Sequence, residues 1–487
     1  MKNSLLLKLY YPVKISVFAL IFLIFCLFYA DAQQFTATEG SIYGGVINTD
    51  VQPASGVNMP YYWDIEVAGL NLFWNNNIFS FSPAKWKWNS DTLITNGHFI
   101  PGDKKRWATV QADVHLLNFL FRWPHRNDLA VGAGWNIHSR IYPDKMDFFY
   151  EDSMRTTEDL LKDYAFNTLQ QGTVINQQWT EWYVTASKVL LDNQQERLTA
   201  GATLKLLKGM AAEVVDIRGV SVGINKSVNP NDLVFTYAAG RYGYSQNLEN
   251  LNNKSTTGEN IRTLMNGSPL SPGLDFGISY LVRERDVIPG FTKDEPAGYN
   301  WKIEASITDW GRLKYPLGGQ SMNVVGIKGQ PSVRRVLNIL DSIKTVQVLN
   351  DSLSAVADLK PWNGAFSISL PTALRINVDK YLGADFFLNT RLVLGMSFLN
   401  PGVNYTINPV SYVMVTPRWE IKRIGIYAPL YMNFHGSLMA GAALRLGPLL
   451  VGLHDFGWLF HDRPGGGGYV ALVIRGLFKN KDECPSF

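Results

Sequence analysis

Hydrophobic and polar residues alternate one by one along many segments of this chain, a pattern typical of β-strands whose two faces meet different surroundings. Over residues 129–141 most odd positions are apolar, whereas the even positions carry small or polar side chains. Residues 197–206 and 301–308 alternate in the same way. The same pattern, with some breaks, covers residues 110–116, 274–283, 386–398, 423–434, 437–445 and 469–476. Roughly 14 to 16 such segments lie between residues 60 and 480, so the sequence predicts an all-β chain.

Two segments have helical periodicity instead. Residues 156–170 begin with a threonine cap and an acidic first turn, and residues 332–346 place Val333, Val336 and Leu337 on one face. Both segments lie between predicted strands. We therefore expect short helices in connections, not a separate helical domain.

Two architectures can produce the alternation. A soluble β-sandwich or propeller wets its polar face, whereas a membrane barrel turns its apolar face to lipid and its small or polar face to the lumen. Here the non-apolar faces are often Gly, Ala, Ser, Thr or Asn, and aromatic residues cluster near strand ends, as at residues 61–63 and 457–460. No propeller-like repeat is found. The favoured fold is a transmembrane antiparallel β-barrel of about 14 strands.

Composition excludes several classes of protein. The chain of 487 residues is 46% hydrophobic and 18% charged, with a net charge of +4 and a mean hydropathy of −0.05. This balance is unlike that of disordered chains or of proteins with many membrane-spanning helices. A nearly balanced charge gives no reason to expect nucleic acid as a partner.

The N-terminus predicts export. Residues 1–32 combine Lys2, Lys8 and Lys14 with an apolar core and a small-residue cleavage site before Gln33, as in a secretory signal peptide. The alternative is a membrane anchor, but the uncharged run over residues 15–30 is short for a spanning helix. We expect delivery to the outer membrane of a Gram-negative bacterium.

The mature chain then divides into two parts. Residues 33–60 precede the first strong strand and are expected to fold into the lumen as a plug segment, and residues 61–487 are expected to form the barrel. Only Cys484 remains after cleavage, so an intramolecular disulfide is excluded.

The sequence contains no motif that nominates a catalytic residue. His454-Asp455 and His461-Asp462 form a repeated pair, which suits either a metal or acid–base site or ordinary turn chemistry; we favour the turn. No nucleophile elbow, P-loop or dinucleotide fingerprint is present in the required context. We expect no enzyme activity, no metal and no cofactor.

The alternation assigns a set of polar residues to the lumen face, where ionisable groups usually pair or line a wet path. Their role is either structural ion pairing that fills the barrel or contact with a substrate. The candidate lumen-facing residues are Asn136, His138, Arg140, Lys205, Lys302, Glu304, Asn389 and Arg391.

Several blocks resemble a Bacteroidetes-type family of uncharacterised outer-membrane proteins, nearly over the whole mature chain. The blocks are residues 46–55, 62–71, 366–374, 415–420 and 443–449. The family's opening has an Asn-Pro-Ala element, where this chain has Gln52, Pro53, Ala54 and Ser55, the candidate plug turn. The family is similar to FadL-type barrels, which have 14 strands and an N-terminal hatch, and to PorV-type barrels.

The resemblance implies two functions. FadL-type barrels move hydrophobic molecules, so passive uptake of a small hydrophobic molecule is expected first. PorV-type barrels serve protein secretion and surface attachment, so a non-transporting scaffold is the alternative. The expected partners are outer-membrane lipid and either a small hydrophobic ligand or a secretion-system protein. An open lumen would favour uptake, and a lumen filled by the plug and paired charges would favour the scaffold.

Overall fold

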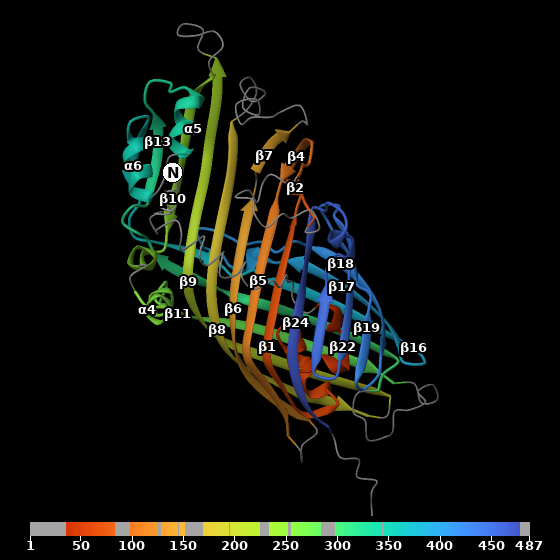
Figure 1. Cartoon of the computed structure of the whole chain (residues 1–487). Helices are drawn as coiled ribbons and strands as arrows, with labels where there is room; N and C mark the ends of the chain where they lie inside the picture. Colours follow the sequence, from red (N-terminus) through yellow and green to blue (C-terminus); the bar gives the residue numbers. More distant parts are fainter. Residues whose placement is uncertain are drawn as a thin grey trace, which may run out of the picture.

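The computed structural model describes residues 36–82, 98–123, 128–144, 146–150, 169–193, 195–224, 233–251, 255–283, 298–341 and 345–477. Within these residues the main antiparallel sheet closes into a barrel of 14 strands, because the first strand, β1, pairs with the last, β24 (Figure 1). The predicted fold class is confirmed.

Most strands of the barrel run without interruption. They are β1 (Tyr61–Asn76), β5 (Ala108–Arg122), β6 (Leu129–Asp144), β8 (Gln170–Asp192), β9 (Glu196–Ile224), β11 (Leu270–Val282), β12 (Trp301–Pro316), β16 (Ala373–Gly383), β17 (Phe386–Gly395), β18 (Tyr412–Glu420), β23 (Leu449–Leu453) and β24 (Gly465–Leu477). Two strands are split, into β19 (Ile424–Tyr427) with β20 (Leu430–Asn433) and into β21 (Leu438–Ala440) with β22 (Ala442–Leu446). The first split lies at Pro429, which has no amide proton to donate.

Further elements lie at one end of the barrel or inside it. The strands are β2 (Phe79–Ser80), β3 (His98–Phe99), β4 (Gly102–Arg106), β7 (Met146–Tyr150), β10 (Leu233–Tyr244), β13 (Met322–Ile327), β14 (Ala357–Pro361) and β15 (Ala365–Ser369). The α-helices are α2 (Val46–Thr49), α4 (Thr257–Leu264), α5 (Val333–Asp341) and α6 (Val346–Ser354). The 3₁₀ turns are η1 (Thr36–Thr38), η2 (Ile42–Gly44), η3 (Pro53–Asn58), η5 (Gln246–Asn250), η6 (Ser397–Leu399) and η7 (Phe456–Leu459).

Burial along the strands is inverted relative to a soluble protein. On β12, Trp301 and Ile303 are 42% and 45% exposed, whereas Lys302 and Glu304 between them are 2% exposed each. A soluble sheet would bury the apolar side chains and wet the charged ones. Exposed apolar residues around buried polar ones are the pattern of a barrel that faces lipid.

The two ends of the barrel differ. Most turns at one end are short, as at residues 384–385, 421–423 and 447–448, although the connection from β11 to β12 at this end is longer. The start of β1 and the end of β24 also lie at this end. Long connections leave the other end, where β9 continues past the barrel and pairs with β10, which pairs with β13. The part of β9 beyond the barrel, β10, β13 and β14 form a sheet, which we call the projecting sheet. It lies with α5 and α6 at the upper left of Figure 1. Short turns are typical of the periplasmic end of such barrels.

The helix expected over residues 332–346 is present as α5, and Val333 packs on Val222 and Leu233 of the projecting sheet. The helix expected over residues 156–170 falls almost wholly outside the described residues, and its last residue, Gln170, begins β8. The signal peptide also lies outside them. Within the described residues, no helix is both long and apolar enough to cross a membrane.

Candidate functional site

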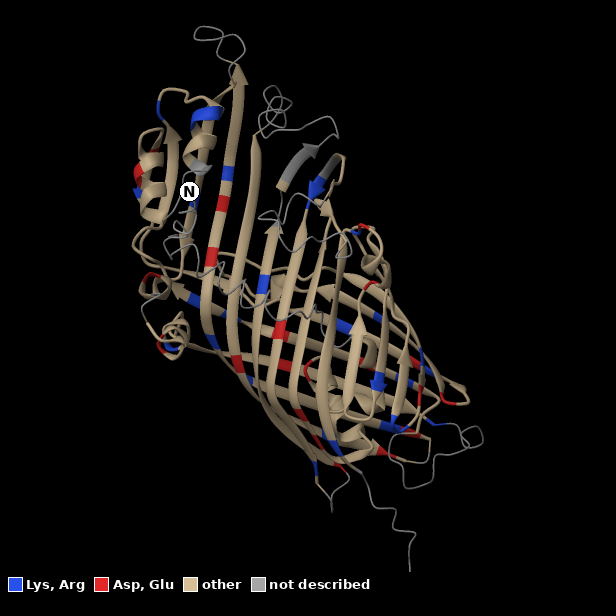
Figure 2. Ribbon diagram, viewed as in Figure 1, with Lys and Arg blue, Asp and Glu red and all other residues tan. Residues whose placement is uncertain are grey.

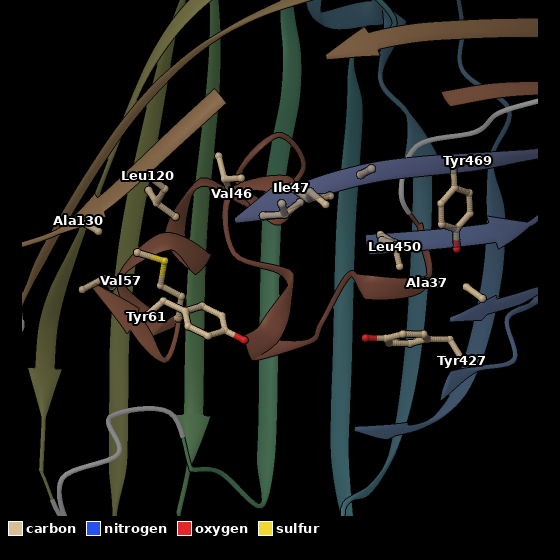
Figure 3. Packing of buried hydrophobic residues seen from close by; sticks show 14 residues of the cluster. Ala37, Val46, Ile47, Val57, Tyr61, Leu120, Ala130, Tyr427, Leu450 and Tyr469 are labelled. Atoms are coloured by element: carbon tan, nitrogen blue, oxygen red, sulfur yellow. The ribbon is translucent and has the colours of Figure 1, made fainter. Parts of the chain in front are cut away.

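Residues 36–58, hereafter the plug, lie inside the barrel. Apolar side chains of the plug, among them Ala37, Ile47 and Val57, pack with inward side chains of the wall such as Leu120 and Tyr427 (Figure 3). The plug makes its contacts on opposite sides of the barrel. It therefore fills the lumen near the short-turn end.

A close backbone approach fixes the middle of the plug to β1. The backbone N–H of Val46 donates to a carboxylate oxygen of Asp64 across 2.9 Å. Gly45 precedes it with φ +57°, and a Cβ on Gly45 would lie 1.5 Å from the same carboxylate. A residue with a side chain does not fit there, so Gly45 is required by both space and conformation.

The candidate plug turn is the start of η3. Pro53 takes the first helical position, and the side chain of Gln52 caps the turn by accepting from the backbone N–H of Ala54 at 3.3 Å. The Gln52 amide also donates to the carbonyls of Ile278 and Ala305, both at 3.2 Å. Glutamine is one methylene longer than the asparagine of the Asn-Pro-Ala element. This length allows the Gln52 side chain both to cap the turn and to reach two strands of the wall.

Glycines in the wall make room for this turn. A Cβ on Gly201 of β9 would meet the carbonyl carbon of Pro53 at 2.4 Å, and a Cβ on Gly277 of β11 would meet the Gln52 amide at 1.9 Å. Ser55 is partly buried and lies at a small polar cavity between plug and wall. The plug turn and the wall therefore fit each other at backbone distance.

Acidic and polar side chains of the plug contact polar side chains of the wall. Glu39 pairs with Arg391 at 2.9 Å, and Asp50 lies 3.4 Å from Nε2 of His115. The hydroxyl of Ser41 donates to Glu420 across 2.6 Å. Burial of the Asp50 carboxyl raises its pKa to about 7.

The structure places all eight candidate lumen residues on the inner face, and it brings three of them together. His138 lies 2.6 Å from Asp113, and Arg140 pairs with the same carboxylate at 2.6 Å. Glu181 then lies 3.4 Å from His138 and 3.6 Å from Lys205. These residues form a continuous chain of alternating basic and acidic side chains across β5, β6, β8 and β9. Figure 2 shows acidic and basic residues distributed over the barrel strands.

The other candidates lie apart from this chain. Lys302 pairs with Glu304 on its own strand at 3.4 Å. Arg391 pairs with the plug, as above, and the amide of Asn389 donates to Asp379 at 3.5 Å. Asn136 is fully buried and accepts from the amide of Asn118 at 3.0 Å.

Sequence reasoning missed most of the acidic residues of the site and one of its arginines, Arg418. Lys205 pairs with Asp309 at 2.7 Å and with Asp275 at 3.0 Å. Near the short-turn end, Arg418 pairs with Asp379 at 2.5 Å and with Glu420 at 2.7 Å. Apart from Asp309, which lies on a bulge, these residues occupy the polar positions of alternating strands, so the rule that selected Lys205 could have found them.

The lumen is closed at the long-loop end by apolar packing. Inward side chains of β8 and β9, such as Trp179 and Leu207, meet Tyr315 of β12, Phe366 of β15 and Tyr405 of the loop over residues 396–411. All of these side chains are buried. We call this cluster the apolar closure; it lies beyond the plug, toward the long loops.

Three small cavities lie within the described part of the barrel. Plug residues line part of the cavities of about 10 and 30 Å³, whereas only wall and loop residues line the cavity of about 40 Å³. The smallest has room for about one water molecule, and the other two have room for about two or three each. The 40 Å³ cavity has apolar walls over part of its surface. Its lining comprises Phe73, Gln111, Arg140, Asp309, Pro371, Arg375, Val393, Pro409, Val410, Tyr412 and Tyr431.

The His454-Asp455 pair lies at the turn that begins η7. Asp455 caps η7 by accepting from the backbone N–H of Gly457 at 3.0 Å. His454 is buried edge-on against Phe73, and this burial lowers its pKa to about 3. In the described part of the chain, no group of three or more His, Cys, Asp and Glu side chains is arranged to hold a metal ion.

Among solved structures, the chain is similar to the Ralstonia pickettii toluene transporter TbuX, with 10% identity and a TM-score of 0.43 over 89% of this chain and 94% of that chain. It is also similar to a Pseudomonas aeruginosa FadL homologue, with 10% identity and a TM-score of 0.36 over 91% and 97%. These likenesses concern the fold alone. No curated protein matches the sequence. The match of residues 53–453 to a family of unknown function (DUF5723) shows that the chain belongs to that family.

Proposed function

We propose that this protein is an outer-membrane barrel for passive uptake of a small hydrophobic molecule, with the plug as its gate. The observation that carries the proposal is the lining of the 40 Å³ cavity between strands of the wall and the loop before β18, where Phe73, Val393 and Tyr412 offer apolar surface to a molecule arriving from the long-loop end. Binding sites for small molecules are usually apolar with a few polar groups. Here Arg140 and Arg375 supply such groups.

The way the plug is held is compatible with gating. The plug is held by hydrogen bonds, ion pairs and apolar packing, and the wall closes by β1–β24 pairing without it. Because the plug is not a strand of the wall, it can shift while the barrel stays closed. The apolar closure has to separate as well, and its contacts are between side chains of different strands and of the loop over residues 396–411.

A substitution inside the cavity tests the proposal. Val393→Trp fills the apolar wall of the cavity, whereas Leu392→Trp adds the same ring to the opposite face of β17. Both variants are expressed in cells, and uptake of a labelled monoaromatic hydrocarbon is measured. We expect Val393→Trp to reduce uptake strongly and Leu392→Trp to leave it unchanged. Equal uptake by both variants and the wild type would contradict the proposal.

A non-transporting scaffold is the second candidate. Two observations favour it: the three cavities described above are small, and the projecting sheet offers a surface beyond the barrel. A scaffold predicts no uptake in any variant, together with loss of a binding partner when residues 317–364, which carry β13, α5, α6 and β14, are replaced by a short linker.

A further inference from the structure

The outward face of β12 marks the edge of the lipid-facing surface. Trp301 and Trp310 point outward and are 42% and 41% exposed, and the outward positions between them include Ile303. Tryptophan gathers at the two membrane–water interfaces of such barrels. Trp310 lies nearer the long-loop end and therefore marks the interface on that side.

Directly beyond Trp310 the outward face becomes basic. Arg312 and Lys314 are exposed on the outer face. The residues that alternate with them, Leu313 and Tyr315, point inward and are buried in the apolar closure. Lys208 of β9 pairs in register with Leu270, the first residue of β11, so it lies on the same side of the barrel. Arg262 in the last turn of α4 adds a fourth cation.

Helix α4 is held against this part of the wall. The amide of Asn247 donates both to the carbonyl of Met210 on β9, at 2.7 Å, and to that of Thr263 on α4, at 3.1 Å. Figure 1 shows α4 beside β11 on the outside of the barrel. Ile261 of α4 and Leu270 are 53% and 56% exposed, so apolar side chains lie among the basic ones.

These four cations differ from those inside the barrel. Arg140, Lys205 and Arg418 all lie within ion-pair distance of carboxylates. For Lys208, Arg262, Arg312 and Lys314, no ion pair or side-chain hydrogen bond is found within the described residues. The nearby Glu259 accepts from the backbone N–H of Thr256 in the capping box of α4. Within the described residues, these four basic side chains are therefore not paired with a carboxylate.

We infer that Lys208, Arg262, Arg312 and Lys314 form a binding site for the anionic, phosphate-bearing headgroup of a lipid in the leaflet on the long-loop side. The exposed Ile261 and Leu270 would meet its acyl chains, and the guanidinium groups suit phosphate because they donate paired hydrogen bonds. Clustered Lys and Arg at a membrane surface attract anionic lipid in general. The inference rests on the membrane-spanning barrel and is independent of uptake.

The test compares purified, folded full-length variants in detergent. The ligand is a bisphosphorylated acylated glucosamine disaccharide, lipid A, and binding is measured by native mass spectrometry. Arg262→Gln/Arg312→Gln/Lys314→Gln removes three charges, and Lys422→Gln/Arg423→Gln removes two exposed charges at the short-turn end as the matched control. We expect the triple variant to bind about tenfold more weakly and the control to bind as the wild type does.

One further set of variants and one further ligand distinguish recognition of the phosphate groups from nonspecific lipid binding. The charge-conserving variant Arg262→Lys/Arg312→Lys/Lys314→Arg should retain binding, and the phosphate-free disaccharide should bind weakly to every variant. Faster migration on unboiled gels verifies that each variant is a closed barrel. Equal binding by the triple variant and the control would overturn the inference, as would full displacement of the lipid by millimolar inorganic phosphate, which would indicate a site for free phosphate.

Discussion

Nε of Arg391 on β17 lies 2.9 Å from a carboxylate oxygen of Glu39 in the plug, and both side chains are buried. This pair joins the first turn of the plug to the barrel wall. A second arginine, Arg375, lies 3.9 Å from the same carboxylate. The plug therefore brings a buried negative charge that the wall neutralises.

Removal of the wall partner should loosen the plug. Arg391→Met leaves Glu39 with the more distant Arg375, and breaking a buried pair typically costs about 3–5 kcal/mol. We expect higher ion conductance in planar bilayers because the plug spends more time displaced. Glu39→Gln/Arg391→Met removes both charges and should conduct less than the single variant. Conductance of Arg391→Met equal to that of the wild type would show that this pair does not hold the plug.

The Asp50 carboxyl should make plug docking depend on pH. Burial raises its pKa to about 7 in the docked state, against 3.8 for an exposed carboxyl. At a pH between these two pKa values, the Asp50 carboxyl takes up a proton when the plug docks. The docked state therefore becomes less stable as pH rises from about 4 to 7. We expect conductance to increase from pH 5 to pH 8 in the wild type. Asp50→Asn should abolish this dependence, and an unchanged profile in that variant would contradict the assignment.

A charge on the lipid face should destabilise the barrel. Ile303 points outward between the two tryptophans of β12, so Ile303→Arg should lower the free energy of unfolding by about 2 kcal/mol. Unfolding in urea from lipid vesicles, followed by tryptophan fluorescence, measures the change. Ile303→Leu is the matched control and should be nearly neutral. If the arginine variant were as stable as the control, the outer face of β12 would not contact lipid.

The apolar closure should contribute strongly to stability. Phe366 is fully buried and stacks with Tyr315 at a ring-centroid distance of 5.7 Å. Phe366→Ala should cost about 3–5 kcal/mol because it removes buried contacts and leaves a cavity. Ser367→Ala on the neighbouring position is the control, and the same urea titration compares the two. A loss below about 1 kcal/mol would indicate that the closure is loosely packed.

The processing of the chain is also open to measurement. The small-residue site before Gln33 predicts a mature N-terminus at that residue and recovery in the outer-membrane fraction. N-terminal sequencing of the purified protein gives the result directly. An N-terminus at Met1 would contradict the predicted signal peptide.

The sequence by itself determined the strands and their faces. Alternation over residues 129–141 and 301–308 is a local property, since the pleat directs successive side chains to opposite sides whatever the neighbouring strands are. That rule assigned His138, Arg140 and Lys302 to one face, and the structure places all three inside the barrel. It could equally have found Asp113 and Glu181, which follow the same period.

Only the tertiary structure decided which of these residues meet. His138 contacts Asp113 and Glu181, which lie 25 and 43 positions away in the chain, because strand register aligns β5, β6 and β8 at that level. Register depends on pairing along whole strands and on bulges, and no local pattern contains it. The same holds for Glu39 with Arg391, and for the projecting sheet on β9. A period of two assigns a side chain to a face, but the partner it meets across the lumen depends on how the entire sheet closes.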